Sequence, residues 1–185
     1  MSTATSTLPK GKLAAGLTVG AAVAVSLGVY GNVHDPTGRS LVTLFFTATI
    51  NLKVWLATAA VLLALFQIGT ALRIYGKIGS GSGPRWLGQV HRASGALAFL
   101  LTIPVAYHCL WALGFQWDSG VRVLVHSLAG SFFFGALAAK VLLVRSKRLP
   151  KLALPLAGGT VFTALVAVWA TSALWFFTTV EFPGF

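Results

Sequence analysis

Apolar and polar positions alternate along the chain in long blocks, with five extended apolar stretches separated by short polar ones. A helix needs about 20 apolar residues to cross the hydrocarbon core of a bilayer, and each stretch is long enough. The pattern therefore predicts an all-α polytopic membrane helix bundle of about five transmembrane helices, forming a single domain over residues 1–185. The predicted spans are residues 13–33, 52–74, 86–113, 121–144 and 154–177.

Three segments need a closer interpretation. Asn51 and Lys53 interrupt the second stretch, so residues 41–49 are interpreted as an interfacial lead-in, and the glycine-rich residues 76–83 as a flexible linker. The basic start and first apolar run could also be a cleaved signal peptide, but the run is longer than the roughly 7–15 residues of a signal core and no A-x-A site follows. We interpret it as a span whose small residues, between Ala14 and Gly28, form a helix-packing surface.

The charges give the predicted spans an orientation. Hydrophobic residues make up 56% of the chain and charged residues 9%, with a net charge of +11, which excludes an ordinary water-soluble domain. Cytoplasmic loops collect Lys and Arg, so the charge indicates topology and not nucleic-acid binding. The cations predicted to lie inside are Lys10, Lys12, Arg73, Lys77, Arg85, Arg92, Arg145, Lys147, Arg148 and Lys151. We expect a multi-pass protein of the plasma membrane, embedded in the lipid bilayer, with the N-terminus inside and the C-terminus, near Glu181, outside.

Two histidines are predicted to lie at one depth on neighbouring spans. The third and fourth spans are joined by a short loop centred near Trp117, so they should form an antiparallel hairpin in which residues at equal depth have numbers that sum to about 234. His108 and His126 sum to 234, in the outer part of the membrane. Intramembrane histidines are costly and point to function. Two facing imidazoles can fill both axial positions of a haem iron.

The neighbours of this pair suit a haem. Gly130, one turn after His126, leaves room for a flat macrocycle, Trp111 can form an apolar wall, and Arg122 can pair with a propionate. The alternative is that the two histidines are unconnected packing or interfacial residues. Zinc is a further alternative that needs four ligands. The single Cys109 allows neither a CxxCH haem attachment nor a CxxC zinc site.

His91 is predicted to lie at a different depth in the membrane from His108 and His126. It precedes His108 by 17 residues, about 25 Å along a helix, near the cytoplasmic surface. No histidine lies where a second haem would need its partner, so His91 is interpreted either as an interfacial residue beside Arg92 or as part of a quinone or electron-donor pocket. Lys140, at a similar depth, can bond a quinone carbonyl or extend its ammonium group to the interface.

Histidines on adjacent transmembrane helices, each near a small residue, resemble those of b-type cytochromes of the ascorbate-reducible and ferric-reductase-like classes. Residues 90–150, with VHRASGALAFLLTIPVAYHCLWALGF and VLVHSLAGSFFFGALAAKVLLVRSKRLP, resemble an uncharacterised family of small actinobacterial membrane proteins grouped with them. This resemblance covers about a third of the chain and implies non-covalent haem b and transmembrane electron transfer. The better-known relatives use four histidines for two haems, whereas this chain offers one pair.

The sequence therefore predicts a membrane electron-transfer cytochrome b subunit with one bis-histidine haem near the extracytoplasmic side. It would pass electrons between the quinone pool and an extracytoplasmic redox partner of iron–sulfur or copper type. The sequence shows no group of residues typical of acid–base or nucleophilic catalysis, so whether the chain is an enzyme by itself stays open. The alternatives are a haem-free structural or anchoring subunit of a membrane complex and a transporter, the latter opposed by the lack of intramembrane carboxylates. The oligomeric state and the haem type stay open.

Overall fold

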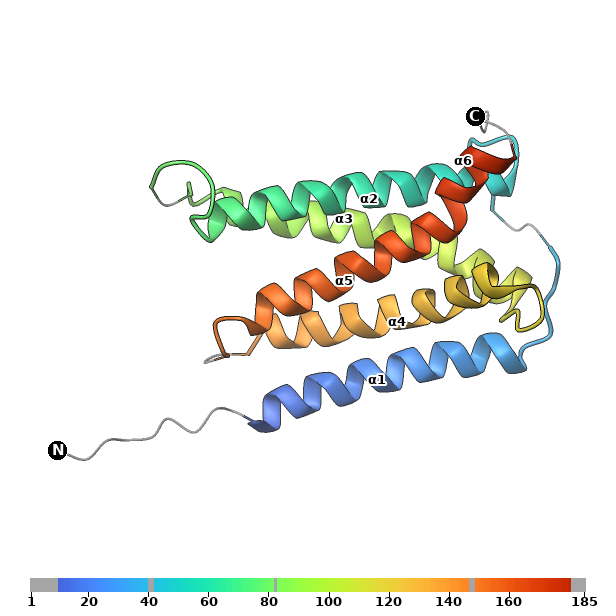
Figure 1. The fold of residues 1–185 in the computed structure, drawn as a ribbon, viewed down its shortest axis with the longest axis horizontal. Helices are drawn as coiled ribbons and strands as arrows, with labels where there is room; N and C mark the ends of the chain where they lie inside the picture. The colour runs from blue at the N-terminus through green and yellow to red at the C-terminus, as the bar shows by residue number, and fades with distance from the viewer. Residues whose placement is uncertain (1–9, 40–41, 82, 147–148, 181–185) are drawn as a thin grey trace. The chain divides into compact units, whose positions relative to one another are not determined.

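Helices make up most of the residues that the structure describes. The computed structural model describes residues 10–39, 42–81, 83–146 and 149–180. The elements, shown in Figure 1, are α1 (Lys10–Val33), α2 (Thr49–Ile74), α3 (Leu87–Tyr107), the π-helix η1 (His108–Leu113), α4 (Val121–Val144), α5 (Ala153–Trp169), the π-helix η2 (Ala170–Leu174) and α6 (Trp175–Thr179). The segment η1 continues α3, and η2 and α6 continue α5.

Among the described residues, five helices are long and apolar enough to cross a membrane, as predicted. They are Gly11–Val33, Thr49–Ile74, Leu87–Leu113, Val121–Val144 and Ala153–Thr179. A helix is the form in which a single segment satisfies all its own backbone groups in lipid. The second span begins at Thr49, three residues before the predicted start, and residues 42–48 contain no helix. The chain is therefore a multi-pass membrane protein.

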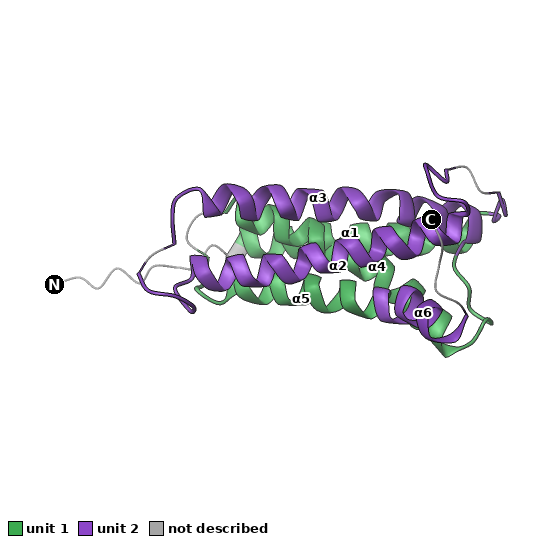
Figure 2. Cartoon of the chain, turned by 90° about the horizontal axis from the view of Figure 1, so that it is seen from above, with its two compact units in different colours: residues 1–34, 115–168 green, residues 35–114, 169–185 purple. Residues whose placement is uncertain are grey.

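The chain divides into two compact units, coloured separately in Figure 2. Unit 1 contains residues 1–34 and 115–168, with α1, α4 and α5 up to Val168. Unit 2 contains residues 35–114 and 169–185, with α2, α3, η1, η2 and α6. The helix that carries His108 thus belongs to unit 2 and the helix that carries His126 to unit 1. The single domain predicted from the sequence stays a prediction.

In unit 1, α1 packs antiparallel against α4 through small residues. A Cβ atom added to Gly20 would lie 2.7 Å from the carbonyl oxygen of Gly135 and 2.8 Å from the Cβ of Ala139. One register relates the facing pairs Gly16–Leu143, Gly20–Ala139, Ala24–Gly135 and Gly28–Ser131. The backbones approach this closely because the seam carries almost no side-chain volume. The predicted packing surface between Ala14 and Gly28 is therefore confirmed.

In unit 2, α2 packs against α3 along most of its length and against η2 at its start. Val54 and Ala57 are buried against Ala173 of η2, with three aromatic side chains, Trp169, Phe176 and Phe177, packed around them. The indole Nε1 of Trp169 donates a hydrogen bond of 3.0 Å to Thr58 Oγ1. Aromatic packing and this polar contact together join the last helical stretch to α2.

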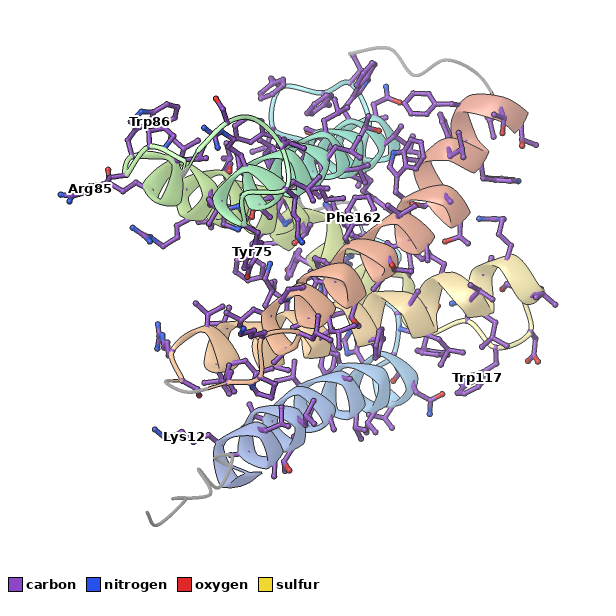
Figure 3. All side chains as sticks on the ribbon, turned by 60° about the vertical axis from the view of Figure 1, so that its left-hand side comes forward. Lys12, Tyr75, Arg85, Trp86, Trp117 and Phe162 are labelled. Carbon is purple, nitrogen blue, oxygen red and sulfur yellow. The ribbon has the colours of Figure 1, made fainter. Side chains whose placement is uncertain are left out.

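Basic side chains gather at one end of each unit. In unit 1 the antiparallel register puts Lys12 and Arg145 at one end, and Figure 3 shows Lys12 and Trp117 at opposite ends. In unit 2 the contacts between α2 and α3 place Arg73 and Arg92 together at one end. Which ends face the cytoplasm stays a prediction. Lys147, Arg148, Glu181 and the C-terminus lie outside the described residues.

The predicted glycine-rich linker is folded around one arginine. The guanidinium group of Arg73 donates hydrogen bonds to the carbonyls of Gly81 at 2.8 Å and Ser80 at 3.0 Å. Gly79 and Gly81 take φ values of 74° and 68°, a region that favours glycine. The glycines thus let the backbone turn its carbonyls towards the end of α2, where a cation also suits the helix dipole.

Candidate functional site

His108 stands where the third span changes from an α-helix to a π-helix. Pro104 has no N–H group to donate along α3, and η1 begins four residues later, at His108. Single π-helical turns within α-helices occur often at functional sites. The imidazole is 2% exposed and packs T-shaped against Tyr107, whose ring stacks on Trp111 with centroids 6.1 Å apart. His108 and the predicted wall residue Trp111 therefore belong to one segment, in which the ring of Tyr107 contacts both side chains.

One ring nitrogen of His108 is held by the chain that precedes α2. Its Nε2 lies 2.9 Å from the backbone carbonyl oxygen of Val42. A carbonyl oxygen only accepts, so Nε2 donates its proton and Nδ1 carries the lone pair of the neutral ring. The N–H groups of Thr37 and Gly38 bond the carbonyls of Trp111 and Ala112 at 3.2 and 3.0 Å. The chain on both sides of residues 40–41 thus caps η1 and fixes the tautomer of His108.

His126, which is half-buried on α4, has the opposite tautomer. Its Nδ1 lies 3.2 Å from the carbonyl oxygen of Val168 in the same unit, so Nδ1 donates and Nε2 carries the lone pair. Val168 lies two residues before η2, where the backbone ladder shifts from i+4 to i+5, and a carbonyl at such a junction can receive a side-chain donor. A metal-ligating histidine usually donates its second ring nitrogen to a carbonyl or carboxylate in this way.

The face of α4 around His126 carries the two other residues assigned to the haem. Arg122 lies one turn before His126 and is half-buried, and Gly130 lies one turn after it. A Cβ atom added to Gly130 would have no heavy atom within 4 Å among the described residues. The surface of α4 at Gly130, one turn from His126, therefore borders open space, which a flat ligand would require.

The similar segment around His91 is filled instead of open. Gly95 follows His91 as Gly130 follows His126, but a Cβ atom on Gly95 would lie only 3.0 Å from Oε1 of Gln67. The amide of Gln67, which projects from α2, thus fills the space beside Gly95. The equivalent space beside Gly130 is open. Two nearly equivalent sequence segments have become different sites because one of them faces a glutamine on the neighbouring helix.

Gln67 and Thr70 connect α2 to the first turns of α3. The amide nitrogen of Gln67 donates to the carbonyl oxygen of His91 and to Ser94 Oγ, the latter at 2.6 Å. Thr70 Oγ1 lies 2.7 Å from Nδ1 of His91 and is 5% exposed. We call Gln67, Thr70, His91 and Ser94 the inner polar cluster. Gln67 and Thr70 are not among the residues predicted from the sequence, although a glutamine within an apolar span was a usable signal.

The predicted site residues fall into two groups. Unit 1 brings Arg122, His126 and Gly130 onto one face of α4, and unit 2 holds His108 beside Trp111. His126 follows the start of its span by five residues and His108 precedes the end of its span by five. The pairing of these histidines across the two units stays a prediction. So does any joint role of His91, in unit 2, and Lys140, in unit 1. The carbonyls of Val42 and Val168 had no signal in the sequence.

Haem fits the two histidines unequally. His126 has the oriented Nδ1 and the basic Nε2 of an axial ligand, with open space beside Gly130. His108 presents its lone pair on Nδ1, and ligation through Nε2 requires the bond to Val42 to open. Within the described residues, no three or more His, Cys, Asp and Glu side chains gather as a zinc site would need, whereas a haem iron needs only two protein ligands.

Comparison with known proteins adds a family but no activity. Residues 13–184 match the model of a family of unknown function, DUF6529. Neither the comparison with curated proteins nor the comparison with solved structures gives a match.

Proposed function

The chain belongs to the DUF6529 family of unknown function, and for this member we propose the role of an electron-transfer cytochrome b subunit of the membrane. It carries one haem b near the extracytoplasmic side and passes electrons between the quinone pool and an extracytoplasmic iron–sulfur or copper protein. The observation that carries the proposal is the environment of His126, where one ring nitrogen is oriented by Val168 and open space lies beside Gly130.

Three residues of unit 1 would hold the haem, through iron ligation, open space and an ion pair. Haem b, when bound, supplies an iron centre that accepts and releases one electron. The bond from Nδ1 to the Val168 carbonyl keeps the ring of His126 in one orientation and raises the basicity of Nε2. Gly130 leaves the neighbouring volume empty, and the guanidinium group of Arg122 offers a partner for an anionic propionate. The apolar face of α4 lowers the local dielectric, which strengthens that ion pair.

His108 is the proposed second ligand. Its burial and the π-helical turn that begins there single it out among the polar residues of unit 2. In the described conformation the basic nitrogen is Nδ1, so His108 binds iron through Nδ1, or through Nε2 once the bond to Val42 has opened. Trp111 belongs to the same segment and supports an apolar wall.

A second candidate function is a haem-free structural or anchoring subunit. The bond of His108 Nε2 to Val42, together with the bonds of Thr37 and Gly38 to the end of η1, favours it, because these contacts already give His108 a structural role. In this alternative both histidines join chain segments by side-chain to backbone hydrogen bonds, and the protein contributes helix surfaces to a complex.

An absorption spectrum tests the first proposal against the second. Protein purified from haem-replete cells should show a Soret band and a sharp reduced α band, both lost in His126→Ala and in His108→Ala. Gly130→Leu fills the open space at Gly130, one turn from His126, and should also lose the bands. Gly159→Leu is the matched control, because its Cβ also meets no described atom within 4 Å. His91→Ala should keep the full spectrum.

The outcomes separate the two candidates. Colourless, folded wild-type protein refutes the cytochrome and supports the structural subunit. If the haem bands of Gly130→Leu are as strong as those of Gly159→Leu, the proposed position of the haem next to His126 and Gly130 is refuted. Half the haem lost in His91→Ala reveals a second haem site at the inner polar cluster.

A further inference from the structure

Lys140 is a cation inside the fourth span. It is half-buried and precedes Val144, the last residue of α4, by four residues, so its Cα atom lies about 6 Å inside the end of the helix. Among the described residues, none accepts a hydrogen bond from its ammonium group and no carboxylate pairs with it. A charged side chain at this depth is costly unless an opposite charge or a polar surface receives it. The ammonium group of Lys140 therefore requires a partner from outside the described chain.

Three exposed cations lie at the same end of unit 1. The register of α1 on α4 places Lys12 at the end where Arg145 follows α4, and Figure 3 shows Lys12 at that end of α1. Lys151 lies in the turn that leads from this end into α5, and all three side chains are exposed. Within the residues described in unit 1, the one acid is Asp118, which precedes α4 at its opposite end. The described side chains at this end of unit 1 therefore carry positive charge and no negative charge.

Depth separates Lys140 from these exposed cations. Exposed cations meet dissolved anions, and salt at about 0.1 M screens their attraction beyond about 10 Å. A dissolved anion would have to leave water to pair with Lys140 inside the span. The phosphate groups of phospholipids already lie at the edge of the hydrocarbon core, which the long stem of a lysine allows its ammonium group to reach. In phosphatidylcholine the choline of the same headgroup neutralises the phosphate, so a lipid with a net negative charge suits Lys140 better.

We propose that Lys140 binds the phosphate group of an anionic phospholipid at this end of unit 1. The ammonium group donates hydrogen bonds to the phosphate oxygens at short range, where salt screens a partly buried pair only weakly. Lys12, Arg145 and Lys151 attract the anionic lipid to this end over a longer distance. The site gives Lys140 a partner other than a quinone carbonyl, and it does not depend on the proposed haem.

Native mass spectrometry measures the binding of single lipid molecules. The full chain in dodecyl maltoside is titrated with phosphatidylglycerol, which has a net negative charge, or with phosphatidylcholine, which has none. The populations with and without a bound lipid give the Kd. The titrations are made in ammonium acetate at about 0.1 M and about 1 M, between which the screening length falls from about 10 Å to about 3 Å. Wild-type protein should bind phosphatidylglycerol more tightly than phosphatidylcholine at both concentrations.

Substitutions separate the half-buried cation from the exposed ones. Lys140→Met should raise the Kd for phosphatidylglycerol about fivefold at both salt concentrations, because one lysine near the headgroups contributes about this much to the binding of an anionic lipid. The Kd for phosphatidylcholine should stay unchanged. Lys140→Arg keeps the charge and the donors and should keep the wild-type Kd. Combining Lys12→Gln, Arg145→Gln and Lys151→Gln should raise the Kd for phosphatidylglycerol only at the lower salt concentration.

Lys53→Met is the matched control. Lys53 is also half-buried and follows Thr49, the first residue of α2, by four residues. It lies in unit 2 at the end opposite to Arg73 and Arg92, so it has the same charge at a similar distance inside its span without that basic pair. Lys53→Met should keep the wild-type Kd for phosphatidylglycerol. Circular dichroism checks the helix content of each variant, and Lys140→Gln replaces Lys140→Met if the latter does not fold.

Four results would overturn the lipid site. A wild-type Kd for phosphatidylglycerol in Lys140→Met shows that water receives the ammonium group. An equal loss of affinity in Lys53→Met reduces the effect to net charge. Loss of the wild-type preference at about 1 M salt leaves only screened attraction by the exposed cations. Displacement of the lipid by inorganic phosphate at constant ionic strength identifies free phosphate as the ligand. Each result is obtained equally from coloured and colourless protein, so it is distinct from the test of the haem.

Discussion

The seam between α1 and α4 makes the sharpest prediction about the fold. Gly20→Ala should destabilise the protein, whereas Gly28→Ala, the same change two turns along the same helix, should not. A Cβ atom on Gly20 would lie 2.7 Å from a backbone carbonyl of α4, but a Cβ atom on Gly28 would have only Ser131 Oγ, at 3.8 Å. Both substitutions raise helix propensity by about 1 kcal/mol. The difference between the two variants therefore isolates the clash.

The expected size follows from the contact distances. Ordinary contact begins at 3.4 Å, so the helices must separate by 3.4 − 2.7 = 0.7 Å to admit the methyl group of Gly20→Ala. The opposing atoms are the Gly135 carbonyl oxygen and the Ala139 Cβ, which cannot rotate away. Overpacking of this kind costs about 1–3 kcal/mol. The unfolding equilibrium constant of Gly20→Ala should exceed that of Gly28→Ala by about 5-fold to 150-fold.

Unfolding in mixed micelles with increasing mole fraction of SDS, followed by circular dichroism, measures this difference. Gly20→Leu and Gly28→Leu extend the comparison, since a longer side chain enlarges the clash only at the seam. Equal stability of Gly20→Ala and Gly28→Ala, and of the two leucine variants, would refute the packing of α1 on α4 in this register.

Three further predictions concern unit 2. Thr58→Val removes the acceptor of the Trp169 indole and should cost about 0.5–1.5 kcal/mol in the same SDS titration. Gly95→Ala pushes a methyl group against Gln67 Oε1, so it should be about 1 kcal/mol less stable than Gly88→Ala, which gains the same helix propensity without displacing that amide. Arg73→Gln removes the donors to the loop carbonyls, which should lower the free energy of loop opening by about 1 kcal/mol and raise the cleavage rate of residues 76–81 by proteinase K about fivefold.

Each of these variants has a control in the same unit. Thr178→Val removes an exposed hydroxyl that bonds only the chain just before it, at Leu174 and Trp175. Gly88→Ala adds a methyl group whose nearest atom, on Arg92, lies 3.8 Å away. Arg85→Gln removes another exposed cation at the end of unit 2 that carries the loop. If a control changes stability or cleavage rate as much as the variant it is paired with, the contact that the variant was designed to remove does not make the predicted contribution.

The spans could be predicted because they depend on local composition. A run of apolar residues longer than the hydrocarbon thickness must form a helix in lipid, whatever it packs against. Five such runs are visible in the sequence, and the predicted and observed boundaries agree closely. The small residues of α1 were also informative, since glycine and alanine repeated every four residues indicate a helix–helix seam.

The chemistry of the histidines depended on partners far along the chain. His91 and His126 occur in similar segments, VHRASG and VHSLAG, yet Gln67 fills the space at Gly95 and nothing described fills the space at Gly130. The backbone carbonyls of Val42 and Val168, which assign opposite tautomers to His108 and His126, belong to residues 66 and 42 positions away. A carbonyl is common to every residue, so no sequence pattern could identify these acceptors.

By itself, therefore, the sequence determined that this is a five-span membrane protein, because length and hydropathy are properties of single segments. It also pointed to the histidines within those spans as candidates, because polar groups are costly in lipid. Only the tertiary structure decided which ring nitrogen of His108 and of His126 carries the proton, and that His91 belongs to a polar cluster with Gln67 and Thr70. Those properties depend on hydrogen bonds that form only when distant segments come within about 3 Å of one another.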